Sequence, residues 1–230
     1  MVATIAIAIG VLAMFRIEAV TALPNITVVP MGRTDCMHWP GWTNKTNTTG
    51  PIQFQIDQSE DADTDGLIAN HLFTTTNRST PVDVNVAEFT TVAHRINKSK
   101  RMGSYQNYRC LDGDVYLLDR NDSMSELREP LRVDTTPGGY RSTFILGTAP
   151  VFGSMAFRST GLRLEPYWHE ENGVRQQGVY LGANNVTTWA MSYWAIGCVV
   201  GHVRVRLLLP GASQPEEGWE FKGFLKIVKH

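Results

Sequence analysis

The chain has 230 residues, of which 43% are hydrophobic and 19% charged, a composition that can bury a core and that excludes a wholly disordered protein. Its 21 basic and 22 acidic residues leave a net charge of −1, which excludes the strongly basic surfaces of nucleic-acid-binding and polybasic membrane-surface proteins. No apolar run reaches the roughly 18 residues that a membrane-spanning helix needs, so we expect no membrane span after signal cleavage.

The amino terminus is typical of a secretory signal peptide. Ile5–Phe15 form an apolar stretch of signal-peptide length, and Val20–Ala22 supply the residues of a cleavage site at their end. No basic residue precedes the apolar stretch, and Arg16 and Glu18 follow it closely, so a buried segment or a signal anchor is the alternative. We expect residues 1–22 to be removed on secretion.

Seven N-glycosylation sequons support secretion, because each Asn lies two residues before Ser or Thr with no Pro between them. They are Asn25, Asn44, Asn47, Asn77, Asn97, Asn121 and Asn185. Glycosylated sequons lie on the surface of secreted proteins, so we predict an extracellular glycoprotein. The polar run Thr43–Thr49 holds two of them and predicts an exposed loop with no fold of its own.

Three cysteines, Cys36, Cys110 and Cys198, predict one disulfide and one remaining thiol in an oxidising compartment. Their connectivity cannot be deduced from the sequence. Cys198 follows the apolar stretch Trp189–Ile196, where a buried free thiol is favoured, and we therefore favour a disulfide between Cys36 and Cys110. A nucleophilic cysteine is the alternative, although no neighbouring His identifies one.

Residues 23–50 are polar and are predicted to lie over the core as an amino-terminal extension. Within it, Trp39 and Trp42 flank a Pro-Gly pair. Exposed aromatic rings on such a turn can stack on sugars, which makes both residues candidates for carbohydrate binding. The alternative is that both rings cover the core near Cys36, since large aromatic side chains are mostly buried.

Apolar and polar residues alternate through 51–230, which predicts a single all-β domain. Such alternation indicates strands with one buried and one solvated face, as in antiparallel sheets. Gly and Pro turns separate the strands, so we expect a single-domain antiparallel β-sandwich or barrel of about ten strands. The strands are predicted at 52–56, 67–74, 82–89, 115–119, 141–146, 162–164, 178–182, 188–196, 203–207 and 219–227.

An acidic segment follows the first of these strands. Asp61, Asp63 and Asp65, with Gly66, match the first half of an EF-hand calcium loop, in which alternate carboxylates face one hard cation. The twelfth loop position is Leu72 instead of Glu, so a true EF-hand is not expected. A looser calcium loop and a solvated acidic turn are the two interpretations, and calcium is the only cofactor that the sequence suggests.

Three segments of the carboxyl half invite other interpretations. Tyr167–Glu171 lacks the second His of a zinc-protease helix and is predicted to be a loop, in which Trp168 is a third candidate sugar platform. Thr188–Ile196 is apolar on both faces, which indicates a central strand, with a groove-lining face as the alternative. Alternate basic residues in His202–Arg206 are expected on a solvated sheet face.

Four stretches of the carboxyl half resemble small fungal secreted proteins, the phiA-type cell-wall proteins and their IgE-binding relatives. They are Asp112–Leu118, Leu131–Thr143, Gly161–Pro166 with Gly178–Gly182, and Thr188–Val205. The family has a cysteine before its Trp-bearing strand, whereas Leu181–Asn185 has none, which leaves Cys198 without the partner that the resemblance implies. The resemblance implies an extracellular or wall-associated fungal protein without an established enzymatic activity.

These observations predict a secreted, N-glycosylated, non-catalytic fungal protein that associates with cell-wall polysaccharide or with an extracellular protein. No nucleophile-elbow or phosphate-loop motif is found in the sequence. One alternative is a carbohydrate-binding module that uses Trp39, Trp42 or Trp168. The other is a secreted carbohydrate-active enzyme, because a pair of glycosidase carboxylates leaves no spacing in the sequence.

Overall fold

The computed structural model describes residues 23–31, 35–68, 71–76, 83–90, 107–118, 130–133, 146–148, 161–196, 199–212, 214–215 and 217–229. The signal segment, the sequons at Asn77, Asn97 and Asn121, and Cys198 lie outside these ranges. Within them, all regular structure is β-strand apart from one short 3-10 helix, and every strand pairing is antiparallel. The predicted all-β antiparallel fold is confirmed.

The described residues hold seventeen strands, more than the predicted ten, because several have only two to four residues. In chain order the elements are β1 (Ile26–Pro30), η1 (Cys36–His38), β2 (Trp42–Thr43), β3 (Thr48–Thr49), β4 (Ile52–Asp57), β5 (His71–Thr76), β6 (Asp83–Thr90), β7 (Tyr108–Leu111), β8 (Asp114–Leu117), β9 (Leu131–Val133), β10 (Leu146–Thr148), β11 (Leu162–Arg163), β12 (Glu165–Glu171), β13 (Val174–Arg175), β14 (Val179–Gly182), β15 (Thr188–Ile196), β16 (Val199–Leu207) and β17 (Glu220–Lys229).

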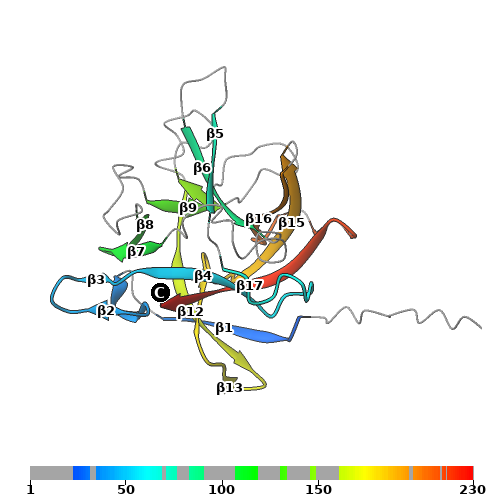
Figure 1. Ribbon diagram of the computed structural model, residues 1–230. Helices are drawn as coiled ribbons and strands as arrows, with labels where there is room; N and C mark the ends of the chain where they lie inside the picture. Colours follow the sequence, from blue (N-terminus) through cyan, green and yellow to red (C-terminus); the bar gives the residue numbers. More distant parts are fainter. Residues whose placement is uncertain are drawn as a thin grey trace, which may run out of the picture.

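The long strand β17 is the centre of the sheet (Figure 1). One of its edges pairs with β15 and then with β14, and the other pairs with β4. From β15 the ladder continues through β16, β6 and β10 to β9. From β4 it continues through β7 to β8, while β14 leads to β12 and the edge strand β1. The sheet therefore branches at β17.

The hydrogen-bonded ladder is not closed into a barrel, but side-chain contacts connect β8, the last strand of one branch, with β9 and β11 at the end of another. Asp114 begins β8 and accepts a hydrogen bond from Arg132 of β9. Arg163 of β11, which pairs with β9, donates to the same carboxylate. Side-chain ion pairs thus connect β8 and β9, where a closed barrel would have backbone hydrogen bonds.

The core is formed by the inward faces of the central strands. Phe54, Trp189, Val203 and Leu225, from β4, β15, β16 and β17 respectively, are each 0% exposed. The Trp189 indole donates to the carbonyl oxygen of Leu181 at 2.9 Å, which satisfies its one polar group. No helix in the described ranges is long and apolar enough to cross a membrane.

The predicted disulfide between Cys36 and Cys110 is present, with 5.6 Å between the two Cα atoms. Both residues are fully buried, and the cross-link joins η1 to β7. Asp35 caps η1 by accepting a hydrogen bond from the backbone N–H of Met37 at 3.2 Å. The amino-terminal extension is therefore covalently fixed to the β domain.

Two segments predicted to be loops form strands instead. Residues 167–171 belong to β12 and pair with all five residues of β1. This strand buries Tyr167 and His169. In the polar run 43–49, the ends pair as β2 and β3 around a turn, and Thr48 also pairs with Leu111 of β7. The pairings with β1 and with β7 involve distant parts of the sequence, so local composition does not reveal them, whereas β2 and β3 pair locally around the exposed residues 44–47.

Candidate functional site

The three tryptophans suggested as a sugar platform lie in different environments. Trp39 is only 3% exposed and belongs to the hydrophobic core that includes Cys36 and Cys110, so neither face of its ring is open to a ligand. Trp42 is half-buried and packs against the edge of the same core. Trp168 is partly exposed on β12. Of the three, Trp42 and Trp168 offer surface to a partner.

Trp168 forms a cation–π pair on the β12–β13 hairpin, which extends away from the rest of the fold (Figure 1). The guanidinium carbon of Arg175 lies 3.4 Å from the ring centroid of Trp168. A tight turn at Asn172–Gly173, where both residues have positive φ, reverses the chain and brings β13 back beside β12. A sugar stacking on that face of Trp168 would therefore have to displace Arg175.

A second aromatic site lies at the turn Asn44–Asn47 between β2 and β3, which we call the sequon turn. The indole N–H of Trp42 donates to Oδ1 of Asn47 at 3.4 Å. Nδ2 of Asn47 in turn donates to Oδ1 of Asp112 at 3.3 Å. Asn47 adopts a left-handed backbone with φ of 48°, a conformation that Asn tolerates well. An indole, a side-chain amide and a carboxylate thus meet at the surface.

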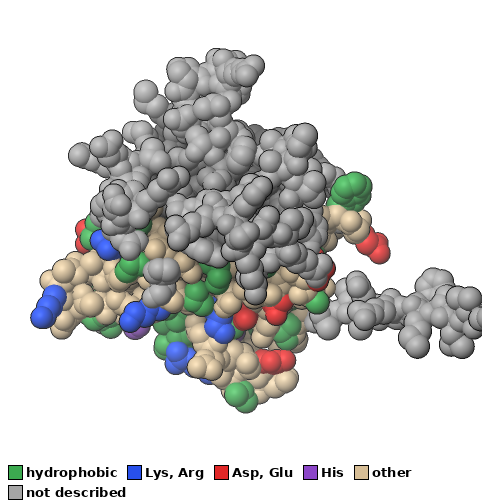
Figure 2. All heavy atoms as spheres, in the orientation of Figure 1, with side chains coloured by type: hydrophobic (Ala, Val, Ile, Leu, Met, Phe, Trp, Pro, Cys, Tyr) green, Lys and Arg blue, Asp and Glu red, His purple; other side chains and the backbone are tan. Residues whose placement is uncertain are grey.

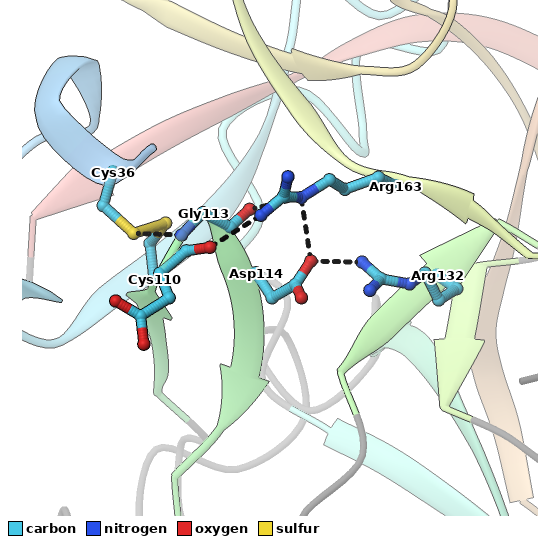
Figure 3. A network of polar contacts seen from close by, with 7 residues as sticks. Cys36, Cys110, Gly113, Asp114, Arg132 and Arg163 are labelled. Carbon is cyan, nitrogen blue, oxygen red and sulfur yellow. Dashed lines mark hydrogen bonds and ion pairs between the residues drawn. A yellow bond between two sulfur atoms is a disulfide. The ribbon is translucent and has the colours of Figure 1, made fainter. Parts of the chain in front are cut away.

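Asp112 connects the sequon turn to a group of polar residues that we call the junction cluster: Asp112, Gly113, Asp114, Arg132 and Arg163. Figure 3 shows how the two arginines approach Asp114 from the same side of the β7–β8 turn. Arg163 Nε lies 2.9 Å and Arg132 Nη1 2.6 Å from Oδ1 of Asp114. Arg163 also donates to the carbonyl oxygens of Asp112 and Gly113.

The junction cluster holds strands in place and leaves little capacity for chemistry. Oδ1 of Asp114 accepts charge-assisted hydrogen bonds from two guanidinium groups, so this oxygen is already engaged in holding β9 and β11. The backbone N–H of Gly113 points at Sγ of Cys36 at 3.1 Å, so the disulfide is continuous with the same network. We therefore assign the cluster a structural role.

Two of the three aspartates of the candidate calcium loop, Asp61 and Asp65, bind the backbone of their own loop. Oδ1 of Asp61 accepts from the N–H of Asp63 at 2.9 Å, and Oδ1 of Asp65 accepts from the N–H of Ser59 at 3.1 Å. No group of three or more His, Cys, Asp or Glu side chains among the described residues is arranged to hold a metal ion. These contacts account for the spacing of the acidic residues without a cation.

All four sequons within the described ranges have an exposed asparagine: Asn25, Asn44, Asn47 and Asn185. Asn25 directly precedes the edge strand β1, and Asn44 and Asn47 lie in the sequon turn. Asn185 lies in the tight turn between β14 and β15 and has φ of 60°. The face shown in Figure 2 carries both basic and acidic side chains, the basic ones mostly on the left and the acidic ones mostly on the right of its described part.

A buried histidine, His169, has a strongly perturbed pKa. His169 stacks on the ring of Tyr180 with 3.6 Å between the centroids, and the edge of Phe224 covers another side. Its Nε2 lies 2.8 Å from Oγ1 of Thr187. Burial lowers the pKa of His169 to about 3, so the ring is neutral at physiological pH. Because the ring is 0% exposed, it has a packing role and no access to substrate.

Sequence reasoning missed two features of the structure. Arg206, expected on a solvated face, is 5% exposed and forms a bidentate ion pair with Glu220 of β17 at 2.7 and 2.9 Å. The alternation of the strand correctly places its side chain opposite Val205, but only the sheet register supplies its acidic partner. Trp219 is 67% exposed in a turn directly before β17. In the sequence, only the neighbouring Glu217 and Gly218 indicate this turn.

No family model and no curated protein matches this chain. The resemblance of its carboxyl half to fungal phiA-type proteins stays a prediction. We therefore infer function from the disulfide, the exposed sequons and the two aromatic sites described above.

Proposed function

We propose that this chain is a secreted, N-glycosylated fungal protein that binds cell-wall polysaccharide or an extracellular protein and does not catalyse a reaction. The observation that carries the proposal is the buried disulfide between Cys36 and Cys110, because such bonds persist in oxidising, secretory compartments. The four exposed sequon asparagines support the same compartment. The fungal and wall-associated part rests on the resemblance alone.

The proposal of a non-catalytic role is supported by how the polar groups of the described residues are used. The carboxylate of Asp114 is shared by two arginines, and His169 is buried under aromatic rings. His169 has no access to a substrate, and Oδ1 of Asp114 is already occupied by hydrogen bonds from two arginines. Binding through the surface is the activity that remains consistent with these residues.

Secretion and binding can be tested with one preparation. The full chain is expressed in a eukaryotic secreting host, and the medium is assayed for a protein that begins at Leu23, loses mass with an N-glycosidase and changes mobility on reduction. The purified protein is then incubated with insoluble chitin, β-glucan and cellulose, and released sugar is measured in the same tubes. Retention in the cell without glycans would refute the proposal. Binding with release of sugar would replace it with an enzymatic function.

A carbohydrate-binding module is the second candidate, favoured by the partly exposed Trp168 on its projecting hairpin. Trp168→Ala should then lower polysaccharide binding by about tenfold, the value of one aromatic contact of roughly 1.5 kcal/mol. Trp219→Ala is the matched control, because Trp219 is 67% exposed and lies outside the hairpin. Equal binding by the Trp168 variant and the wild type would exclude this hairpin as the platform.

A further inference from the structure

We propose that the N-glycan on Asn47 packs against the indole of Trp42, so that the carbohydrate that Trp42 contacts is the protein's own. This inference rests on the proposed function, since it requires passage through the secretory pathway. The sequon turn would then hold a glycosylated asparagine, Asn47, whose first sugar contacts the neighbouring indole of Trp42.

The position of the Trp42 indole relative to Asn47 is the first argument. The indole N–H of Trp42 donates to Oδ1 of Asn47 at 3.4 Å, so the edge of the indole lies beside the side-chain amide. An N-glycan is joined to Nδ2 of that same amide, and its first sugar therefore begins next to the indole. The cross-strand pairing of Trp42 with Thr49, the third residue of the sequon, keeps the ring and the sequon on one short hairpin.

The orientation of the amide is the second argument. Nδ2 of Asn47 donates to Oδ1 of Asp112, and glycosylation leaves one N–H on this nitrogen. Arg163 holds the backbone of Asp112 through its carbonyl oxygen at 2.7 Å, so the acceptor belongs to the fixed junction cluster. The hydroxyls of Thr43 and Thr46, 2.9 Å apart, close the turn from the other side. The first sugar would thus be attached to an amide that hydrogen bonds hold in one orientation.

The half-buried state of Trp42 is the third argument. One part of its ring packs against the core, and the remaining apolar surface faces solvent next to Asn47. The C–H face of a sugar complements an aromatic ring, and covering it removes apolar area from water. Among the described sequons, Asn47 is the one whose side chain bonds to an aromatic residue; the side chains of Asn25, Asn44 and Asn185 show no such contact within the described ranges.

The test observes the first sugar directly. The secreted protein is labelled with ¹³C in its N-acetyl groups, trimmed enzymatically to one N-acetylglucosamine per site, and studied by NMR, with site occupancy measured by mass spectrometry. We expect one sugar whose resonances are shifted upfield by the indole ring current and that shows cross-relaxation with Trp42. The shifted signal should disappear in Asn47→Gln and Trp42→Leu. It should persist in Asn44→Gln, which removes the neighbouring sequon of the same turn.

Trp42→Phe keeps the proposal testable if Trp42→Leu does not fold. This variant retains an aromatic ring without the N–H, and we expect a smaller upfield shift. An occupied Asn47 whose sugar has ordinary shifts would overturn the inference, as would a shift that survives in Trp42→Leu. An Asn47 that is unoccupied while other sequons carry glycans would overturn this inference and leave the proposed function intact. A secreted protein without any glycan, or one that is never secreted, would refute the proposed function itself.

Discussion

Replacing Cys36 and Cys110 together by alanine is expected to lower the free energy of unfolding by about 4 kcal/mol. The disulfide joins residues that are 74 positions apart, and a cross-link of that span removes unfolded-chain entropy worth roughly 4 kcal/mol at 25 °C. Loss of Sγ of Cys36 also leaves the N–H of Gly113 without its acceptor. For a chain of this length the thermal midpoint should fall by roughly 10 °C.

Urea unfolding followed by tryptophan fluorescence measures this change, with Cys198 retained in every protein. The variant should unfold at lower urea and with a steeper dependence on urea, because the uncrosslinked unfolded chain exposes more surface. Wild-type protein in reductant is the matched control and should behave like the variant. A loss of stability below about 1 kcal/mol would refute the reasoning, since it would mean that the cross-link does not constrain the unfolded state.

Three further predictions concern charged or titratable side chains. Asp114→Asn should destabilise the fold by about 2 kcal/mol, because two guanidinium groups lose their shared carboxylate; urea titration checks this against the exposed control Glu217→Gln, which should change little. Glu220→Gln should cost about 3 kcal/mol, because it removes the carboxylate that balances the buried charge of Arg206. The double variant Arg206→Met/Glu220→Met should cost less than the single one, and a double variant that is less stable would contradict this. Finally, the pKa of His169 is about 3 in the folded protein and 6.5 when exposed, so the unfolded chain takes up the proton first. The contribution of His169 to the free energy of unfolding should therefore be complete at neutral pH and fall by about 1.4 kcal/mol per pH unit as the pH drops below 6.5. His169→Gln, compared over the same pH series, should lack that contribution.

The sequence predicts the strands whose pattern of apolar residues follows directly from which of their faces are buried. β4, β14 and β15 match their predicted ranges to within one residue, because each alternates against a core that covers one or both faces. The register of the β15–β16 pairing shifts between Trp194 and Ile196.

Features that depend on a distant partner were not predictable. β12 reads as a loop because Pro166 lies within it and His169 is polar, and its strand character comes from β1, more than a hundred residues earlier. The pairing of Arg206 with Glu220 likewise depends on the register between β16, β15 and β17. The disulfide was predicted correctly because Cys198 follows an apolar stretch that favours a buried free thiol, which left Cys36 and Cys110 as the favoured pair.

Recognising a sequon does not reveal whether its threonine is accessible in the folded protein. Thr49 is 2% exposed and its hydroxyl accepts from the N–H of Cys110 at 2.9 Å, while Thr187 is 0% exposed beside His169. By contrast, Thr27 and Thr46 are exposed. Because the tripeptide is recognised through this hydroxyl, the sequons that end in Thr49 and Thr187 can be glycosylated only before the chain folds.

Occupancy of Asn47 and Asn185 should therefore depend on the rate of folding, whereas occupancy of Asn25 and Asn44 should not. The bond from Cys110 to Thr49 lies next to the disulfide, so closing that disulfide withdraws the hydroxyl from the glycosylation machinery. Brief treatment of the secreting cells with reductant delays this step and should raise the occupancy of Asn47, as measured by glycopeptide mass spectrometry. Asn44, three residues earlier in the same turn, is the internal control. An equal rise at Asn44 and Asn47 would show that reductant acts on the host and not on the order in which this chain folds.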